Sequence, residues 1–149
     1  MHTNFSETTT QILTNSGWFP ERVVDIKKTV DFLESKGYQP FPCVLKMLSE
    51  FDGLKCNFQR PNGDKDSFHI ITEEAYGDYY EKEDFEEIEM RLNEPIIAIG
   101  EARNDYMMMF MSRSGKVFGE MGYCLVKLGD NIFEALELLC QALPGEEIE

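Results

Sequence analysis

The chain has 149 residues, of which 42% are hydrophobic, and a formal net charge of -14 at pH 7. This length suits one domain around one core, and the hydrophobic share excludes intrinsic disorder for most of the chain. The negative charge repels phosphate backbones and anionic membrane surfaces and attracts basic partners. We therefore expect no direct contact with nucleic acid or with a membrane.

The sequence carries the features of a cytoplasmic protein. Its start, MHTNFSETTT, lacks a basic region followed by an apolar run, and no segment approaches the ~20 apolar residues that span a bilayer. The cysteines are scattered without a CxxC pair, which argues against a zinc site, a redox centre or a disulfide framework. We expect buried free thiols at Cys43, Cys56, Cys124 and Cys140.

The stretch SGWFPERVVDI (residues 16–26) predicts a corner between two helices. Trp18 and Phe19 are two large apolar surfaces, and Pro20 suits the first turn of a new helix. We expect both aromatic rings to plug the core and the Arg22 stem to pack beside them, with its guanidinium on a carboxylate or on exposed carbonyls. The alternative is an aromatic binding site.

Three helices are expected before any strand. Ser6 can cap the first, which ends near Ser16, and the second runs from about Pro20 to Lys36 with apolar residues every three or four positions. A third, short helix ends at Gly53. The inward positions of the last two are Val23, Ile26, Val30 and Leu33, and then Val44, Leu45, Leu48 and Phe51.

The rest of the chain predicts strands and a closing helix. PIIAI (residues 95–99) has no polar face, as in a central strand buried on both sides, and the methionine-rich run at 106–111 is expected in the core rather than at a copper site. Asp130 is expected to cap a last helix that ends near Leu143, followed by a frayed acidic tail. The other expected strands are 54–59, 67–72, 116–121 and, as strand or loop, 122–128.

Together these elements predict an α+β fold: N-terminal helices, a mostly antiparallel sheet with an inserted acidic helix, and a C-terminal helix packed on the sheet. We expect a single domain over residues 1–149, with an ordered core at about 6–144.

The segment Glu73–Glu94 is the strongest shift in composition, with ten acidic residues against Lys82 and Arg91. A helix over about 81–92 would bury a narrow apolar stripe and expose most of the carboxylates. Two interpretations stay open, a solvated helix face and a surface for a basic partner. The expected stripe comprises Tyr79, Phe85, Ile88 and Leu92.

Catalytic and metal-binding patterns are scarce in the sequence. The histidines are His2, in the first residues of the chain, and His69, inside an expected strand where a hydrogen-bonded structural imidazole is the favoured role. No catalytic triad, HExxH motif or glycine-rich nucleotide loop occurs, and the alternation of Asn62, Asp64 and Asp66 lacks the glutamate of a calcium loop. We predict no enzyme activity, no metal and no cofactor.

Several motifs resemble the third subgroup of the SUKH superfamily of bacterial immunity proteins, from about Gln11 to Leu143. GWFPER resembles the Gly-Trp, Pro and Arg that open the family domain, and FDGL, PIIAIG, SGKVF and EALELL resemble its later helices, strands and glycine turn. One departure is GEMGYC, where members often have an aromatic residue and Tyr123 is the nearest candidate. The matched positions expected to be structural are Gly17, Trp18, Pro20, Arg22, Phe51, Gly53, Leu54, Pro95 and Gly115.

The resemblance implies a non-enzymatic protein that binds and neutralises the C-terminal domain of a cognate polymorphic toxin, often a nuclease. A nuclease presents basic residues to its substrate, so an acidic surface suits such a partner. The same superfamily includes intracellular regulators, which is the alternative; a small-molecule-binding domain is a third possibility. The predicted toxin-binding residues are Tyr76, Asp78, Tyr79, Tyr80, Glu81, Glu83, Asp84, Glu86 and Glu87.

Overall fold

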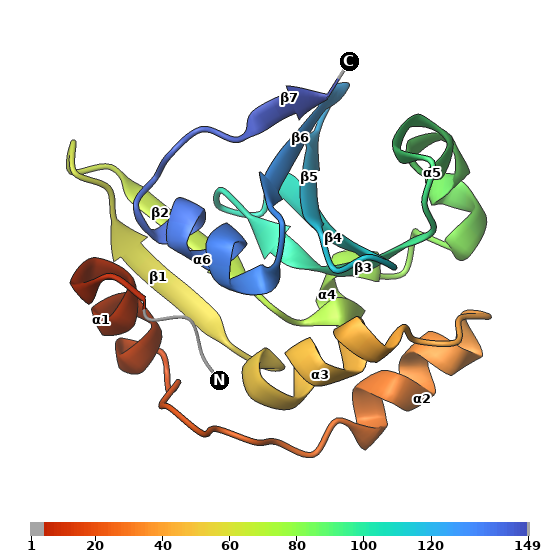
Figure 1. Ribbon diagram of the computed structural model, residues 1–149, viewed down its shortest axis with the longest axis horizontal. Helices are drawn as coiled ribbons and strands as arrows, with labels where there is room; N and C mark the ends of the chain where they lie inside the picture. Colours follow the sequence, from red (N-terminus) through yellow and green to blue (C-terminus); the bar gives the residue numbers. More distant parts are fainter. Residues whose placement is uncertain (1–4, 149) are drawn as a thin grey trace.

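The computed structural model describes residues 5–148 and has an α+β fold, as predicted (Figure 1). Three helices come first and pack around a sheet that the rest of the chain builds. They are α1 (Glu7–Asn15), α2 (Lys27–Ser35) and α3 (Pro42–Phe51). Ser6 caps α1 as expected, because its hydroxyl accepts a hydrogen bond from the backbone N–H of Thr9 at 3.2 Å.

A seven-stranded antiparallel sheet follows, in which each strand pairs with the next along the chain. Helix α4 (Thr72–Tyr76), the 3-10 helix η1 (Lys82–Phe85) and α5 (Glu86–Leu92) lie between the second and third strands, and α6 (Ile132–Cys140) precedes the last strand. The strands are β1 (Lys55–Gln59), β2 (Lys65–His69), β3 (Ile96–Ala102), β4 (Met107–Ser112), β5 (Val117–Met121), β6 (Cys124–Gly129) and β7 (Glu146–Ile148).

Both faces of the sheet centre are covered. On one face the ring of Phe110 in β4 meets Phe85 of η1 at 5.0 Å between centroids. On the other face Met111 borders a pocket shared with Met47 of α3 and Ile132 of α6. This double coverage explains why β3 and β4 lack a polar face in the sequence, and it confirms their predicted core positions. Tyr106, which precedes β4, is 77% exposed, so its predicted core position is wrong.

The N-terminal corner departs from the predicted helix. Helix α2 starts at Lys27 instead of Pro20, and the residues between them run along the end of α3, where the N–H of Val24 donates to the carbonyl of Ser49 at 2.8 Å. Val23 is 78% exposed, so its expected inward position is wrong. Contacts with α3 therefore override the local helical pattern.

Only one of the two corner aromatics enters the core. Trp18 is 6% exposed, whereas Phe19 is 55% exposed, which corrects the prediction that both plug the core. Gly17 closes α1 with a φ of 106° and donates from its N–H to the carbonyl of Thr14. This turn directs the Trp18 indole inward.

Two predictions at the C-terminal end are also corrected. Asn131, not Asp130, caps α6, and its side-chain oxygen accepts from the N–H of Glu134 at 2.9 Å, while Asp130 pairs with Lys127. The tail is not frayed over residues 146–148, because β7 pairs with β6 in an antiparallel register. The sheet therefore gains an edge strand with little apolar signal in its sequence.

The cysteines differ in burial. Cys56 and Cys140 are buried free thiols, as expected, and burial raises the pKa of Cys56 to about 11. Cys43 is partly buried and Cys124 is exposed, which corrects the expectation for these two.

Candidate functional site

The acidic segment folds as α4, η1 and α5 and is anchored through its apolar side. Phe85 and Ile88 are 4% and 6% exposed, as the predicted stripe requires. Tyr79, another of the four residues predicted in that stripe, is 86% exposed and does not belong to it. Buried apolar side chains thus hold the segment against the sheet, and most of its carboxylates are left at the surface.

Tyr76 is the predicted toxin-binding residue that the structure removes from the surface. It is fully buried, its hydroxyl accepts a hydrogen bond from the N–H of Ala98 at 3.3 Å, and its ring contacts Phe32 and Phe85. Burial raises the pKa of its phenol. Tyr76 therefore anchors α4 to β3 and cannot contact a partner.

The other eight predicted residues are exposed and form what we call the acidic face. Two of its carboxylates have structural partners: Glu81 pairs with Lys36 at 2.7 Å, and Asp84 accepts from the N–H of Glu81 at 2.7 Å. Within residues 5–148, the other four carboxylates make no hydrogen bond or ion pair, so their charge is directed at solvent. The face comprises Asp78, Tyr79, Tyr80, Glu81, Glu83, Asp84, Glu86 and Glu87, and its unpaired members are Asp78, Glu83, Glu86 and Glu87.

A pocket of about 290 Å³ borders the acidic face where Tyr80 meets the sheet. Three carboxylates and a second tyrosine line it, contributed by β3, β5 and the turn between β3 and β4. We call it the tyrosine-carboxylate pocket; its lining includes Tyr80, Glu101, Asp105, Tyr106, Met108 and Glu120. The sequence analysis did not find it, because three of its acidic residues stand singly, far from the acidic segment.

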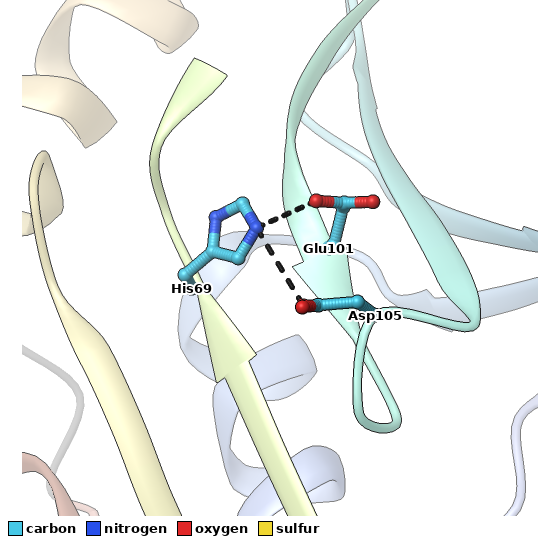
Figure 2. A group of neighbouring side chains, drawn as sticks. All are labelled: His69, Glu101 and Asp105. Carbon is cyan, nitrogen blue, oxygen red and sulfur yellow. Dashed lines mark hydrogen bonds and ion pairs between the residues drawn. The ribbon is translucent and has the colours of Figure 1, made fainter. Parts of the chain in front are cut away.

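Figure 2 shows the imidazole of His69, from β2, directed at Glu101 and Asp105, two of the residues that line this pocket. The N–H of Ile71 donates to Nδ1 at 3.2 Å, so the ring proton is on Nε2 and donates to Oε1 of Glu101 at 2.8 Å. Oδ1 of Asp105 lies 3.7 Å from the same nitrogen. These contacts confirm the predicted structural imidazole and show that it positions Glu101.

A glycine brings this histidine and glutamate together. β3 carries a bulge between Ala98 and Gly100, and a Cβ on Gly100 would lie 1.9 Å from the carbonyl oxygen of His69. Only glycine allows the two strands to approach this closely.

The same three side chains could in principle hold a metal, since their ligand-type atoms lie within 4.8 Å of one another. A metal on Nε2 of His69 would move the ring proton to Nδ1, where it would face the N–H of Ile71. The two N–H donors would then face each other, and the partly buried N–H of Ile71 would lose its acceptor. The donor arrangement fits a hydrogen-bonded histidine better than a metal ligand.

The residues of the N-terminal corner have partners inside the molecule. The indole N–H of Trp18 donates to Oε2 of Glu50 at 3.0 Å, and the guanidinium of Arg22 donates to the carbonyls of Glu50 and Asp52, the latter at 2.9 Å. These carbonyls lie at the C-terminal end of α3, where a cation is favourable. The predicted packing of Arg22 on exposed carbonyls is confirmed.

Burial lowers the pKa of Arg22 from its usual value, although the neighbouring carboxylates Asp52 and Glu50 oppose this effect. The corner is thus a structural element in which each polar group named above has an internal partner.

The chain thus has an α+β fold in which the acidic segment is anchored to the core and exposes most of its carboxylates to solvent. A family model, the SUKH-3 immunity protein family, matches residues 5–142 of the chain. The chain therefore belongs to the SUKH-3 immunity proteins. Comparison with curated proteins gave no match, and comparison with solved structures gave none either. In the described residues, no helix has the length and apolar character needed to cross a bilayer.

Proposed function

We propose that this protein binds a cognate toxin through the acidic face and thereby neutralises it. Family membership supports the class of function, since the matching family is one of immunity proteins. The observation that supports this docking surface is a set of four carboxylates with no partner among residues 5–148: Asp78, Glu83, Glu86 and Glu87. They lie on a segment that Phe85 and Ile88 anchor to the core.

Charge complementarity supports a basic partner. The net charge of -14 attracts cationic proteins over distance and speeds their encounter at low salt. A nuclease toxin carries a basic substrate cleft, and a rigid acidic face can occupy that cleft or its rim without catalysis of its own. We propose the C-terminal domain of a polymorphic toxin as the partner and the cytosol of the toxin-producing cell as the site of action.

Exposed tyrosines complete the face. Tyr79 is 86% exposed and Tyr80 is 42% exposed, and aromatic rings of this kind often anchor protein interfaces. They supply contact area that the carboxylates lack. The charges thus favour encounter, and the rings favour a long-lived complex.

The test uses the toxin domain encoded beside this gene, with affinity measured by titration calorimetry at low and high salt. A variant with Asp78→Asn, Glu83→Gln, Glu86→Gln and Glu87→Gln should lose at least tenfold in affinity at low salt and show a flatter salt dependence. Its far-UV circular dichroism should be unchanged.

The matched control neutralises four exposed carboxylates elsewhere: Glu7→Gln, Glu21→Gln, Asp25→Asn and Asp64→Asn. Helix α1, which carries Glu7, lies on the opposite side of the molecule from α5 in Figure 1. The control should retain most of the affinity. Equal losses in both variants would show that net charge alone acts, and no loss in the first would remove the acidic face as the docking surface.

A further inference from the structure

The floor of the tyrosine-carboxylate pocket is a row of side chains across three strands. Glu101 of β3 is paired in register with Met108 of β4, and Met108 with Glu120 of β5. Directly opposed residues on antiparallel strands project from the same face of a sheet. Two carboxylates therefore flank one thioether, and Asp105 adds a third carboxylate from the adjacent turn.

The negative charge of this floor is poorly compensated from within the chain. Glu101 accepts from His69 through Oε1, but in the stretch 5–148 the Glu120 side chain makes no hydrogen bond or ion pair. Burial raises the pKa of Glu120 and outweighs the opposing charge of Arg91, whose guanidinium donates to the carbonyl of Ile148. An incoming cation would relieve a charge that the fold leaves half buried.

Two tyrosines stand at the rim of this floor. Tyr80, from the loop before η1, is 42% exposed, and Tyr106, in the turn between β3 and β4, is 77% exposed. Aromatic faces attract cations, and carboxylates accept their hydrogen bonds. This combination favours the guanidinium group of arginine, which is flat and has several donors, over the compact, strongly hydrated ammonium group of lysine.

We propose that the tyrosine-carboxylate pocket receives an arginine side chain of the toxin. The guanidinium stacks against Tyr80 or Tyr106 and donates to Glu120 and Glu101, and its aliphatic stem lies over Met108. That the arginine belongs to a toxin rests on the proposed function. In that complex the pocket would bind one side chain, whereas the acidic face would attract the partner through its overall negative charge. Tyr80 belongs to both, so the two surfaces are continuous.

The experiment needs no toxin. The protein is labelled with ¹³C at its methionine methyl groups and titrated with the blocked peptide acetyl-Gly-Arg-Gly-amide, and then with the same peptide carrying citrulline, the neutral isostere of arginine. The Met108 methyl signal should shift on addition of the arginine peptide, with saturation at millimolar concentrations, and should move at least fivefold less with citrulline. Glu120→Gln should weaken the arginine response at least threefold.

Glu7→Gln, which removes an equal charge from α1, is the matched control and should leave the titration unchanged. Equal shifts with arginine and citrulline, or no Met108 shift, would overturn the proposal. Toxin binding distinguishes this failure from failure of the proposed function. If neutralising the acidic face weakens the toxin complex while Glu120→Gln does not, the pocket is excluded and the acidic face stands.

Discussion

The N-terminal corner and the acidic face differ in where their polar groups find partners. In the corner, Trp18 and Arg22 bond to Glu50 and to the end of α3. On the acidic face, four carboxylates have no hydrogen bond or ion pair within the described part of the chain. The polar side chains of the corner thus bind within the protein, whereas those four carboxylates point to solvent on a segment that buried side chains anchor from beneath.

This difference shows why the most recognisable motif is not the candidate binding site. GWFPER stands out because a buried indole, a left-handed glycine and a cation on carbonyls each restrict the residue type. A charged surface accepts many sequences, so it shows in composition rather than in a motif. Substitutions in the corner should change stability, and substitutions on the face should change binding.

Among these substitutions, Trp18→Ala should have the largest effect on stability. Loss of the buried indole and of its hydrogen bond to Glu50 should lower the free energy of unfolding by about 3–5 kcal/mol, measured by urea denaturation. Phe19→Ala is the matched control, because the neighbouring ring is 55% exposed, and should cost less than about 1.5 kcal/mol. Similar losses of unfolding free energy in both variants would mean that Trp18 and Phe19 do not differ in burial as described.

Glu137 of α6 is a carboxylate with several hydrogen-bond partners, in contrast to the four carboxylates of the acidic face that have none in the described part of the chain. Partial burial acts to raise its pKa, but hydrogen bonds from Ser6, Thr9 and Gln141 outweigh this, and the net pKa is lowered. Ser6 donates to it from both N–H and hydroxyl, at 2.8 and 2.6 Å. Because its folded pKa lies below the unfolded one, its stabilisation is present above the usual glutamate pKa and is lost as the pH falls through the folded value.

Glu137→Gln should therefore lower the free energy of unfolding by about 1 kcal/mol at pH 7. The difference from the unsubstituted protein should shrink as the pH falls below about 4.5, the usual glutamate value. Urea denaturation across pH 3–7 measures this. A difference that stays constant with pH would show that the ionised carboxylate is not what joins α6 to α1.

The smallest effect on stability is expected on the acidic face. The double variant Glu86→Gln and Glu87→Gln should change the free energy of unfolding by no more than about 0.5 kcal/mol, because neither carboxylate has a partner among residues 5–148. Thermal denaturation at low and high salt checks this. A loss above about 1 kcal/mol would indicate that these charges serve the fold, and the contrast with the corner would fail.

Much of the architecture is determined locally and was predicted from the sequence. The apolar run at 95–99 indicated a strand buried on both faces, which β3 is, and the glycine turns placed the boundaries of α1, α3 and the β4–β5 hairpin. The acidic segment and its anchors Phe85 and Ile88 also followed from spacing. Such features depend on neighbours within a few residues, so composition and hydrophobic periodicity are enough to predict them.

Other features depend on contacts between distant residues. Residues 20–26 have a helical pattern, yet hydrogen bonds from Val24 and Arg22 to the end of α3 hold them in a non-helical conformation. Tyr76 lies in a polar segment, yet α2 and β3 enclose its ring and hydroxyl. β7 forms because β6 offers an unpaired edge. In each case the stabilising partner is far away in the chain.

The sequence by itself determined the charge, the strands of the core and the segment that bears the acidic face. Only the tertiary structure placed Glu101, Asp105 and Glu120 in one pocket, because β3, β5 and the turn before β4 converge there. Sheet pairing sets this convergence: register aligns side chains across strands, and no local pattern records which strands will pair.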